Sequence, residues 1–442
     1  MTRRYRREWL ILALIGAAAL TVLNPRNPQD VSRIGLSLSI LERGSLNIDP
    51  YALGTSDRAF RDGHWYSDKA PGLSVLALPT VAALRGIDKV AGNPHGLRMY
   101  NRSGHIWILR MLTGGMALLL CSLLLGRAAE WLQPGYGAVV ALTYALGTIA
   151  GPLGSTTFDN GVAAAVAFAA FYLAMKGRRY AFAAGAVAGA AVLFEYQSAL
   201  IAVALAGYVA IRYGRRSLLA YVGGGVPFAV LLSLYNQATF GSPFHTSYNY
   251  VRNQFTERQH EGFFGIGTPT GHGAWFLFFD GRGIFVVSPV LVAAAVGLVL
   301  LWRRGFRAEA GLCGFVTLIF IFVAMGYFEP YGGISPGPRF FAPALPFLAL
   351  GLADAYRRFP AVTALLALYS VTMVTLDSLS WGIINKLQIY FAPHATWAPN
   401  TAWSRLPVID FYTGIYFVYA FVALALAYGA VELVRTGRRG LA

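Results

Sequence analysis

The sequence predicts an all-α membrane protein that crosses the bilayer many times. Of its 442 residues, 56% are hydrophobic and only 13% are charged, and the mean hydropathy is +0.52. Soluble domains carry about 25% charged residues. Apolar runs close to the length that crosses a bilayer recur along the whole chain and predict about twelve spans. We expect one integral membrane domain, residues 1–442, with no separate soluble domain.

The first apolar run follows the basic stretch Arg3-Arg4-Tyr5-Arg6-Arg7. No small-residue cleavage site follows it, so we expect an uncleaved first helix rather than a signal peptide. The two apolar runs that flank Glu195 are predicted as two spans, and the alternative is that together they form one re-entrant feature. The predicted spans are 9–23, 105–126, 135–152, 159–175, 180–195, 197–212, 218–235, 285–302, 309–327, 340–355, 360–380 and 411–434.

The distribution of charge predicts the orientation of these spans. The net charge of +16 reflects basic residues in short connections, which is typical of cytoplasmic loops and does not require nucleic acid as a partner. Both termini are then cytoplasmic, and the Arg- and Ala-rich composition favours a bacterial plasma membrane. Cys121 and Cys313 both fall in predicted spans, so a disulfide framework is not expected. The long loops are all predicted outside, at 24–104, 236–284, 328–339 and 381–410.

The first outer loop, 24–104, is predicted to contain two helices on the membrane surface and the catalytic centre. The first helix covers 31–43 and ends at Gly44, and the second covers 73–84. Asp30 lies at the start of the first helix. It is either a simple N-cap or a carboxylate that takes a proton from an incoming hydroxyl, and the two roles do not exclude each other.

Lys69 lies just before Pro71, which can open a helix at its first turn. A helix N-terminus already favours anions, so a phosphate there would meet backbone N–H groups and an ammonium together. The alternative is a lysine that extends to lipid headgroups. Asp68 is either its salt-bridge partner or a second site acid. His64 and Tyr66 either line the same pocket or anchor the loop at the interface.

Four further polar residues are candidates for the same outer pocket. Arg339 ends a loop rich in Gly and Pro and suits a phosphate oxygen, unless it pairs with Glu329 to close that loop. Asp159 opens a predicted span and is an N-cap in the simplest interpretation. Glu195 lies between two apolar runs, where a carboxylate should face a cavity or a partner.

The remaining outer loops are rich in aromatic residues. Loop 236–284 is predicted to be a lid over the acceptor, and loop 381–410 to anchor at the headgroups. The spacing of the histidines in the lid matches no compact metal site. The lid aromatic residues are Tyr248, Tyr250, Phe255, Phe263 and Phe264, its histidines are His245, His260 and His272, and the tryptophans of the last loop are Trp381, Trp397 and Trp403.

The first outer loop resembles that of the GT-C superfamily, and is similar to the protein mannosyltransferase and aminoarabinose transferase group (glycosyltransferase family 39-like). The resemblance rests on the acid after the first span, the two surface helices and the element Tyr66-x-Asp68-Lys69-x-Pro71. It implies a polyprenyl-phosphate sugar donor at the outer face, with Asp30 as the catalytic acidic residue and Lys69 as the phosphate contact. The acidic doublet common in the family is Gln29-Asp30 here, which weakens any metal role.

We therefore expect an inverting glycosyltransferase that moves a hexose or pentose from a polyprenyl phosphate to a hydroxyl of a glycan, lipid or protein. Asp30 would deprotonate the acceptor, and Lys69 and Arg339 would stabilise the leaving phosphate. No cofactor is required, with Mg²⁺ or Mn²⁺ as the alternative. The rivals are a transporter or flippase for a lipid-linked sugar, and a polysaccharide polymerase or ligase that would hold a diphosphate with Arg282 and Arg339.

Overall fold

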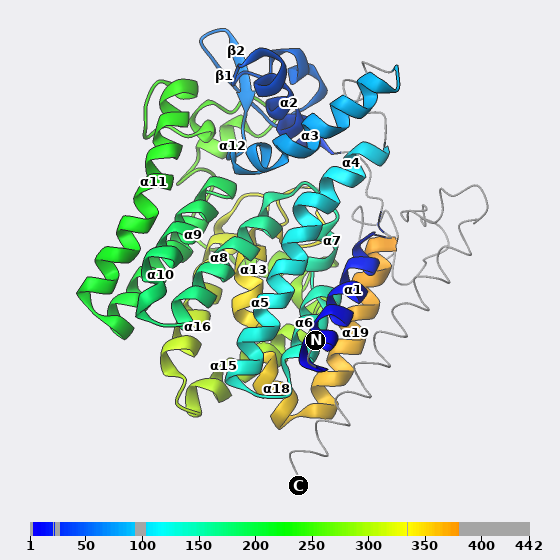
Figure 1. Cartoon of the computed structure of the whole chain (residues 1–442), viewed down its shortest axis with the longest axis vertical. Helices are drawn as coiled ribbons and strands as arrows, with labels where there is room; N and C mark the ends of the chain where they lie inside the picture. The colour runs from blue at the N-terminus through cyan, green and yellow to red at the C-terminus, as the bar shows by residue number, and fades with distance from the viewer. Residues whose placement is uncertain (1–2, 21, 23–26, 93–102, 334, 380–442) are drawn as a thin grey trace, which may run out of the picture.

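The structure, a computed structural model, describes residues 3–20, 22, 27–92, 103–333 and 335–379, and its fold is almost wholly helical (Figure 1). A small layer formed by residues 28–90, which we call the cap, lies at one end of a bundle of apolar helices (Figure 1). The predicted loop 381–410 and the predicted span 411–434 lie outside the described residues.

The bundle contains most of the predicted spans as helices. Residues 340–355 are instead broken into short pieces, because Pro343 and Pro346 cannot donate backbone hydrogen bonds. The bundle helices are α1 (Arg3–Leu20), α4 (Ser103–Arg110), α5 (Met116–Leu132), α6 (Gly137–Gly147), α7 (Ala150–Gly154), α8 (Asp159–Met175), α9 (Ala181–Phe194), α10 (Ser198–Tyr213), α11 (Arg215–Phe240), α15 (Val290–Arg303), α16 (Arg307–Gly326), α17 (Leu345–Ala349), α18 (Leu352–Arg358) and α19 (Pro360–Leu379).

Short elements connect these helices. The π-helical turn η2 (Met111–Gly115) joins α4 to α5 without a break. The segment between α11 and α15 holds the 3₁₀ turn η4 (Ser247–Tyr250) and the helices α12 (Thr256–His260), α13 (Gly271–Phe278) and α14 (Ile284–Val287). Two further 3₁₀ turns are η3 (Arg178–Tyr180) and η5 (Arg339–Ala344).

The cap begins with α2 (Pro28–Arg43), which starts three residues earlier than predicted. Asn27 is its N-cap, and its Oδ1 accepts hydrogen bonds from the backbone N–H groups of Gln29 and Asp30. In return Asp30 Oδ2 accepts from the Asn27 N–H at 2.7 Å, which completes a capping box. Asp30 is therefore the third residue of the helix rather than its N-cap. Gly44 ends the helix in the left-handed conformation, as predicted.

The cap continues through the 3₁₀ turn η1 (Asp49–Gly54) and a hairpin of β1 (Arg58–Arg61) and β2 (His64–Ser67), in which Arg58 pairs with Ser67. The second cap helix, α3 (Gly72–Val90), starts directly after Pro71. A Cβ atom on Gly72 would lie 2.5 Å from the carbonyl oxygen of Leu193 in α9. Only glycine permits this approach, which holds the start of α3 against the end of α9.

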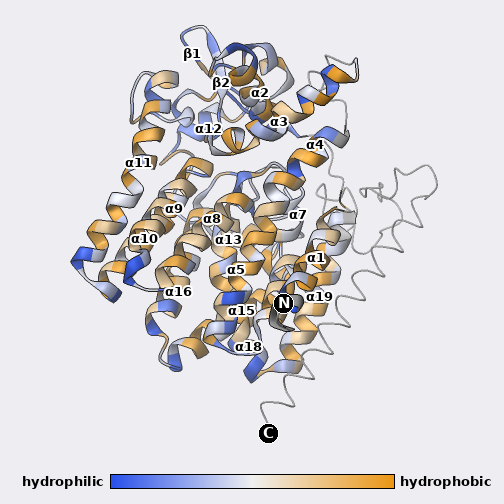
Figure 2. Cartoon of the chain, viewed as in Figure 1, coloured by the Kyte–Doolittle hydropathy of each residue, from blue (hydrophilic) through white to orange (hydrophobic). Residues whose placement is uncertain are grey.

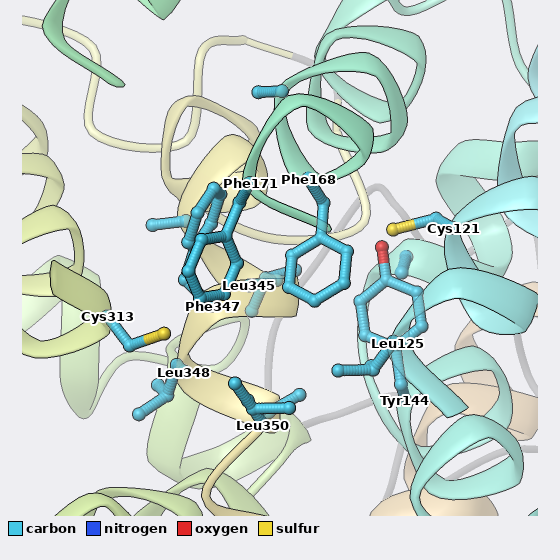
Figure 3. Packing of buried hydrophobic residues seen from close by; sticks show 14 of the residues in the cluster. Cys121, Leu125, Tyr144, Phe168, Phe171, Cys313, Leu345, Phe347, Leu348 and Leu350 are labelled. Carbon is cyan, nitrogen blue, oxygen red and sulfur yellow. The ribbon is translucent and has the colours of Figure 1, made fainter. Parts of the chain in front are cut away.

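Aromatic and aliphatic side chains fill the centre of the bundle (Figure 3). Phe168 and Phe171 of α8 pack against Phe347 of α17, with ring centroids 5.3 Å and 5.6 Å apart. Each such ring contributes about 1.5–3 kcal/mol when it is fully buried. Cys121 and Cys313 are buried and free, as the prediction of no disulfide requires.

The helices have the composition of a membrane protein. Among the described residues, three are long and apolar enough to cross a bilayer: His105–Leu132, Arg215–Phe240 and Arg307–Gly326. Figure 2 shows apolar residues along the bundle helices and hydrophilic ones in the cap and at the opposite end. The α10–α11, α15–α16 and α18–α19 turns, which are rich in arginine, lie at that opposite end (Figure 1). The count of about twelve spans and the side of the membrane stay predictions.

Candidate active site

A cavity of about 210 Å³ lies where the cap meets the ends of α8, α9 and α16. Six of the residues singled out in the sequence line it: Asp68, Lys69, Asp159, Glu195, Glu329 and Arg339. They come from segments far apart in the chain. The structure thus brings together the two predicted phosphate contacts and four of the predicted polar neighbours.

Lys69 lies between β2 and the start of α3. Its Nζ is 3.0 Å from Asp68 Oδ2 and 3.7 Å from Asp57 Oδ2, so the predicted pairing with Asp68 is present. Burial tends to lower the pKa of Lys69, but the negative charges of Asp57 and Asp68 outweigh it and raise that pKa. Lys69 is therefore a cation that faces the cavity.

Asp68, the residue before Lys69, is buried and also lines the cavity. The Ser247 hydroxyl donates to the backbone carbonyl of Asp68, which ties the cap to η4. Burial raises the pKa of the Asp68 carboxyl to about 6, although the adjacent Lys69 charge lowers it. Its Oδ1 is buried and has no hydrogen-bond partner among the described residues.

Arg339 is the first residue of η5 and also lines the cavity. Its guanidinium lies 4.5 Å from the centroid of the Phe158 ring and 5.2 Å from that of Phe340, and such contacts fix its plane. Its Nε is buried and has no hydrogen-bond partner in the described part of the chain. No ion pair joins Arg339 to Glu329 within that part, so the alternative of a closed Glu329–Arg339 pair is wrong.

Two further carboxylates face the cavity from the ends of α8 and α9. Asp159 is the first residue of α8, and its Oδ2 lies 2.7 Å from Nη2 of the buried Arg33. Glu195 lies in the turn between α9 and α10, and its Oε2 accepts a hydrogen bond from Asn160 Nδ2 at 2.9 Å. Glu195 is thus a cavity residue, as predicted, and Asp159 is the first residue of its helix rather than the N-cap.

Asp30 is fully buried and is not among the residues that line the cavity. Arg110 donates to both of its carboxylate oxygens, from Nη2 at 2.6 Å and Nε at 3.3 Å, and the Thr157 hydroxyl donates to Oδ1 at 2.6 Å. Together with the Asn27 backbone N–H, these donors occupy the carboxylate. The role of Asp30 as a base stays a prediction, and its surroundings favour a structural role.

His64 and Tyr66 are also absent from the cavity lining. His64 is exposed, and its Nδ1 lies 2.8 Å from Asp49 Oδ2. The Tyr66 ring meets Phe240 edge-on, with centroids 5.7 Å apart. Both contacts fit the alternative in which these residues anchor the loop.

The 236–284 segment contributes Tyr248 and Phe255 to the lining, whereas Phe263 is 72% exposed and outside it. Arg282 is turned to the adjacent loop, where its Nη1 donates to the Ser335 carbonyl at 3.0 Å. No group of three His, Cys, Asp or Glu side chains within the described residues is arranged to hold a metal ion.

Comparison with known proteins gives likenesses in structure alone. No family model and no curated protein matches the sequence. The fold is similar to that of ArnT. The structure of ArnT from Cupriavidus metallidurans bound to undecaprenyl phosphate has 14% identity and a TM-score of 0.49, over 98% of this chain and 72% of that one. The archaeal oligosaccharyltransferase AglB from Archaeoglobus fulgidus, in complex with an inhibitory peptide and a dolichol-phosphate, has 14% identity and a TM-score of 0.48, over 95% of this chain and 60% of AglB.

Several site residues escaped the sequence analysis. Asn160 follows Asp159 directly, and Arg33 lies four residues after Gln29, whose Oε1 accepts from Arg33 Nη2 at 3.0 Å. The helical spacing of Gln29 and Arg33 is a readable signal. The pairing of Arg33 with Asp159 joins positions far apart in the chain, and no local pattern indicates it.

Proposed function

We propose that this protein transfers a sugar from a polyprenyl-phosphate donor to an acceptor hydroxyl, with inversion at the anomeric carbon. One observation carries the proposal: Lys69 and Arg339 line the same cavity as the carboxylates of Asp159 and Glu195. Such a cavity combines cations that can bind the donor phosphate with carboxylates that can take a proton from the acceptor hydroxyl. The transferred sugar is a hexose or pentose, and the acceptor is a hydroxyl of a glycan, lipid or protein.

The two cations suit a phosphate that leaves the sugar. Lys69 precedes the N-terminus of α3, where free backbone N–H groups favour an anion, and it adds a full positive charge. Arg339 presents a guanidinium whose plane is fixed by Phe158 and Phe340. Negative charge that develops on the departing phosphate would be stabilised by groups already in place, so no strong general acid is needed.

The site geometry favours an enzyme over the rival functions. A flippase has no need for a buried carboxylate such as Glu195 beside its phosphate contacts, because it forms and breaks no bond. The polymerase or ligase hypothesis requires Arg282 and Arg339 in one diphosphate site, whereas Arg282 donates to loop carbonyls and is not among the lining residues. We place the active site at the outer face of a bacterial plasma membrane, with both termini cytoplasmic.

A transfer assay tests this proposal. Purified protein in detergent is given radiolabelled undecaprenyl- and decaprenyl-phosphate sugars, together with glycan, lipid and protein acceptors. We expect product from the wild type, and a loss of about 10- to 100-fold in kcat/KM for Lys69→Met, the range for one hydrogen bond to a charged group. Lys89→Met removes an exposed lysine of α3 and is the matched control.

The outcome that would contradict the proposal is donor binding without product for every sugar tested. Movement of labelled donor across reconstituted vesicles in the same experiment would then identify a flippase. If Lys69→Met transferred sugar as well as the wild type, the phosphate contact would have to lie elsewhere.

A further inference from the structure

The cavity holds five carboxylates, and three of them are paired with cations. Asp57 and Asp68 both face Lys69, at 3.7 Å and 3.0 Å from its Nζ. Asp159 is held by Arg33 at 2.7 Å. One oxygen of each of these three carboxylates already contacts a cation, so that oxygen is not available to take a proton from an acceptor hydroxyl.

Glu195 differs from them in its contacts. It forms no ion pair within the described residues, although its side chain is almost completely buried. Asn160 holds Oε2 at 2.9 Å, while Oε1 accepts no hydrogen bond from the described chain. Because Glu195 lines the cavity, this second oxygen is free to receive a proton there. The fifth carboxylate, that of Glu329, is half-buried and accepts no hydrogen bond from the described residues.

Burial and the surrounding charges shift the pKa of Glu195 upward on balance. It lies in the turn between two helices, and burial together with the negative charge of Asp159 raises its pKa above the ordinary value, whereas the positive charges of Arg33, Arg339 and Lys69 lower it. The net shift is upward. Asp159, paired with Arg33, and Glu195, which forms no ion pair with the described residues, are thus two carboxyl groups in different environments, the arrangement that separates acid and base roles.

We propose that Glu195 is the general base of the transfer reaction, an assignment that rests on the proposed function. Its Oε1 takes the proton of the acceptor O–H bond. The electron pair of that bond forms the new bond between the acceptor oxygen and the anomeric carbon. The bond from that carbon to the phosphate oxygen breaks, and its electron pair leaves with the polyprenyl phosphate, beside Lys69 and Arg339. Asn160 is a positioning residue that holds the other carboxylate oxygen.

Kinetics of Glu195→Gln test the assignment. Glutamine keeps the shape and the contact with Asn160 but cannot take a proton. We expect kcat to fall by about 100- to 10,000-fold, the usual contribution of a general base. Binding of undecaprenyl phosphate should stay within a few-fold of the wild type, which also shows that the variant is folded. Glu195→Asp should recover part of the rate, and Glu261→Gln, on an exposed side chain of the outer segment, is the matched control.

The pH profile gives a second readout. Wild-type activity should fall as the pH drops through the pKa of Glu195, because the protonated form cannot act as a base. This limb should lie above the ordinary glutamate value of about 4.3. The residual activity of Glu195→Gln should lack the limb.

The outcomes separate this assignment from the proposed function. A wild type that gives no product from any donor contradicts the function itself. An active wild type together with an equally active Glu195→Gln overturns the base alone. A large loss in Glu329→Gln with no loss in Glu195→Gln would also overturn it and assign the base to Glu329.

Discussion

Asp30 and Arg110 are both almost completely buried, and two hydrogen bonds join their side chains. A buried ion pair is costly to break, because the partner that remains is an uncompensated charge in a medium of low polarity. Thr157 and the Asn27 backbone complete the contacts of the carboxylate. At the scale of single residues, Asp30 therefore joins the start of α2 to α4 and the segment before α8.

We predict that Asp30→Asn destabilises the protein by about 3–5 kcal/mol, the cost of removing one member of a buried pair. Thermal unfolding in detergent measures this loss. The double variant Asp30→Asn with Arg110→Gln should recover part of it, since no buried charge is then left without its partner. Unchanged stability of Asp30→Asn, with transfer abolished and Glu195→Gln active, would restore Asp30 as the base.

Single residues were predictable where the chemistry is local. Lys69 beside a helix start, Arg339 among aromatic residues and Glu195 between apolar runs each carry a signal within a few positions, and all three line the cavity. The partners of these residues were not predictable. Arg33 and Asp159, or Asn160 and Glu195, meet only through the packing of separate helices.

At the scale of elements, the two predicted cap helices are present, with shifted boundaries. α2 begins at Pro28 rather than at 31, because Asn27 supplies the cap. α3 continues to Val90, beyond the predicted end at 84, and so passes through Gly86. That both helices lie along the membrane surface stays a prediction.

Gly72 is the position where α3 touches α9 most closely. We predict that Gly72→Ala costs about 1–3 kcal/mol, the usual range for overpacking, because the new Cβ would meet the Leu193 backbone. Donor binding should weaken as well, since Lys69 lies three residues before this contact. Thermal unfolding and donor titration measure the two effects. Gly86→Ala, in the same helix with open space around it, should be neutral or stabilising, and equal behaviour of both variants would contradict the account.

At the scale of the whole molecule, composition was enough to predict a helical membrane protein, but not how its loops meet. The cavity draws on the cap, on the ends of α8 and α9, and on residues 248–259 and 327–340. Hydrophobic periodicity describes each helix separately and contains no information on which loops lie side by side. The site is therefore a product of the packing of the bundle, which only the structure shows.

Equilibrium binding of undecaprenyl phosphate and undecaprenol tests the central claim, that Lys69 and Arg339 form a phosphate site in this cavity, most directly. The two lipids differ only in the phosphate. We predict that the wild type binds the phosphate at least about 100-fold more tightly, the value of two charged hydrogen bonds, and that Lys69→Met with Arg339→Met abolishes the difference while Lys89→Met keeps it. Equal affinity of the wild type for both lipids would contradict the claim.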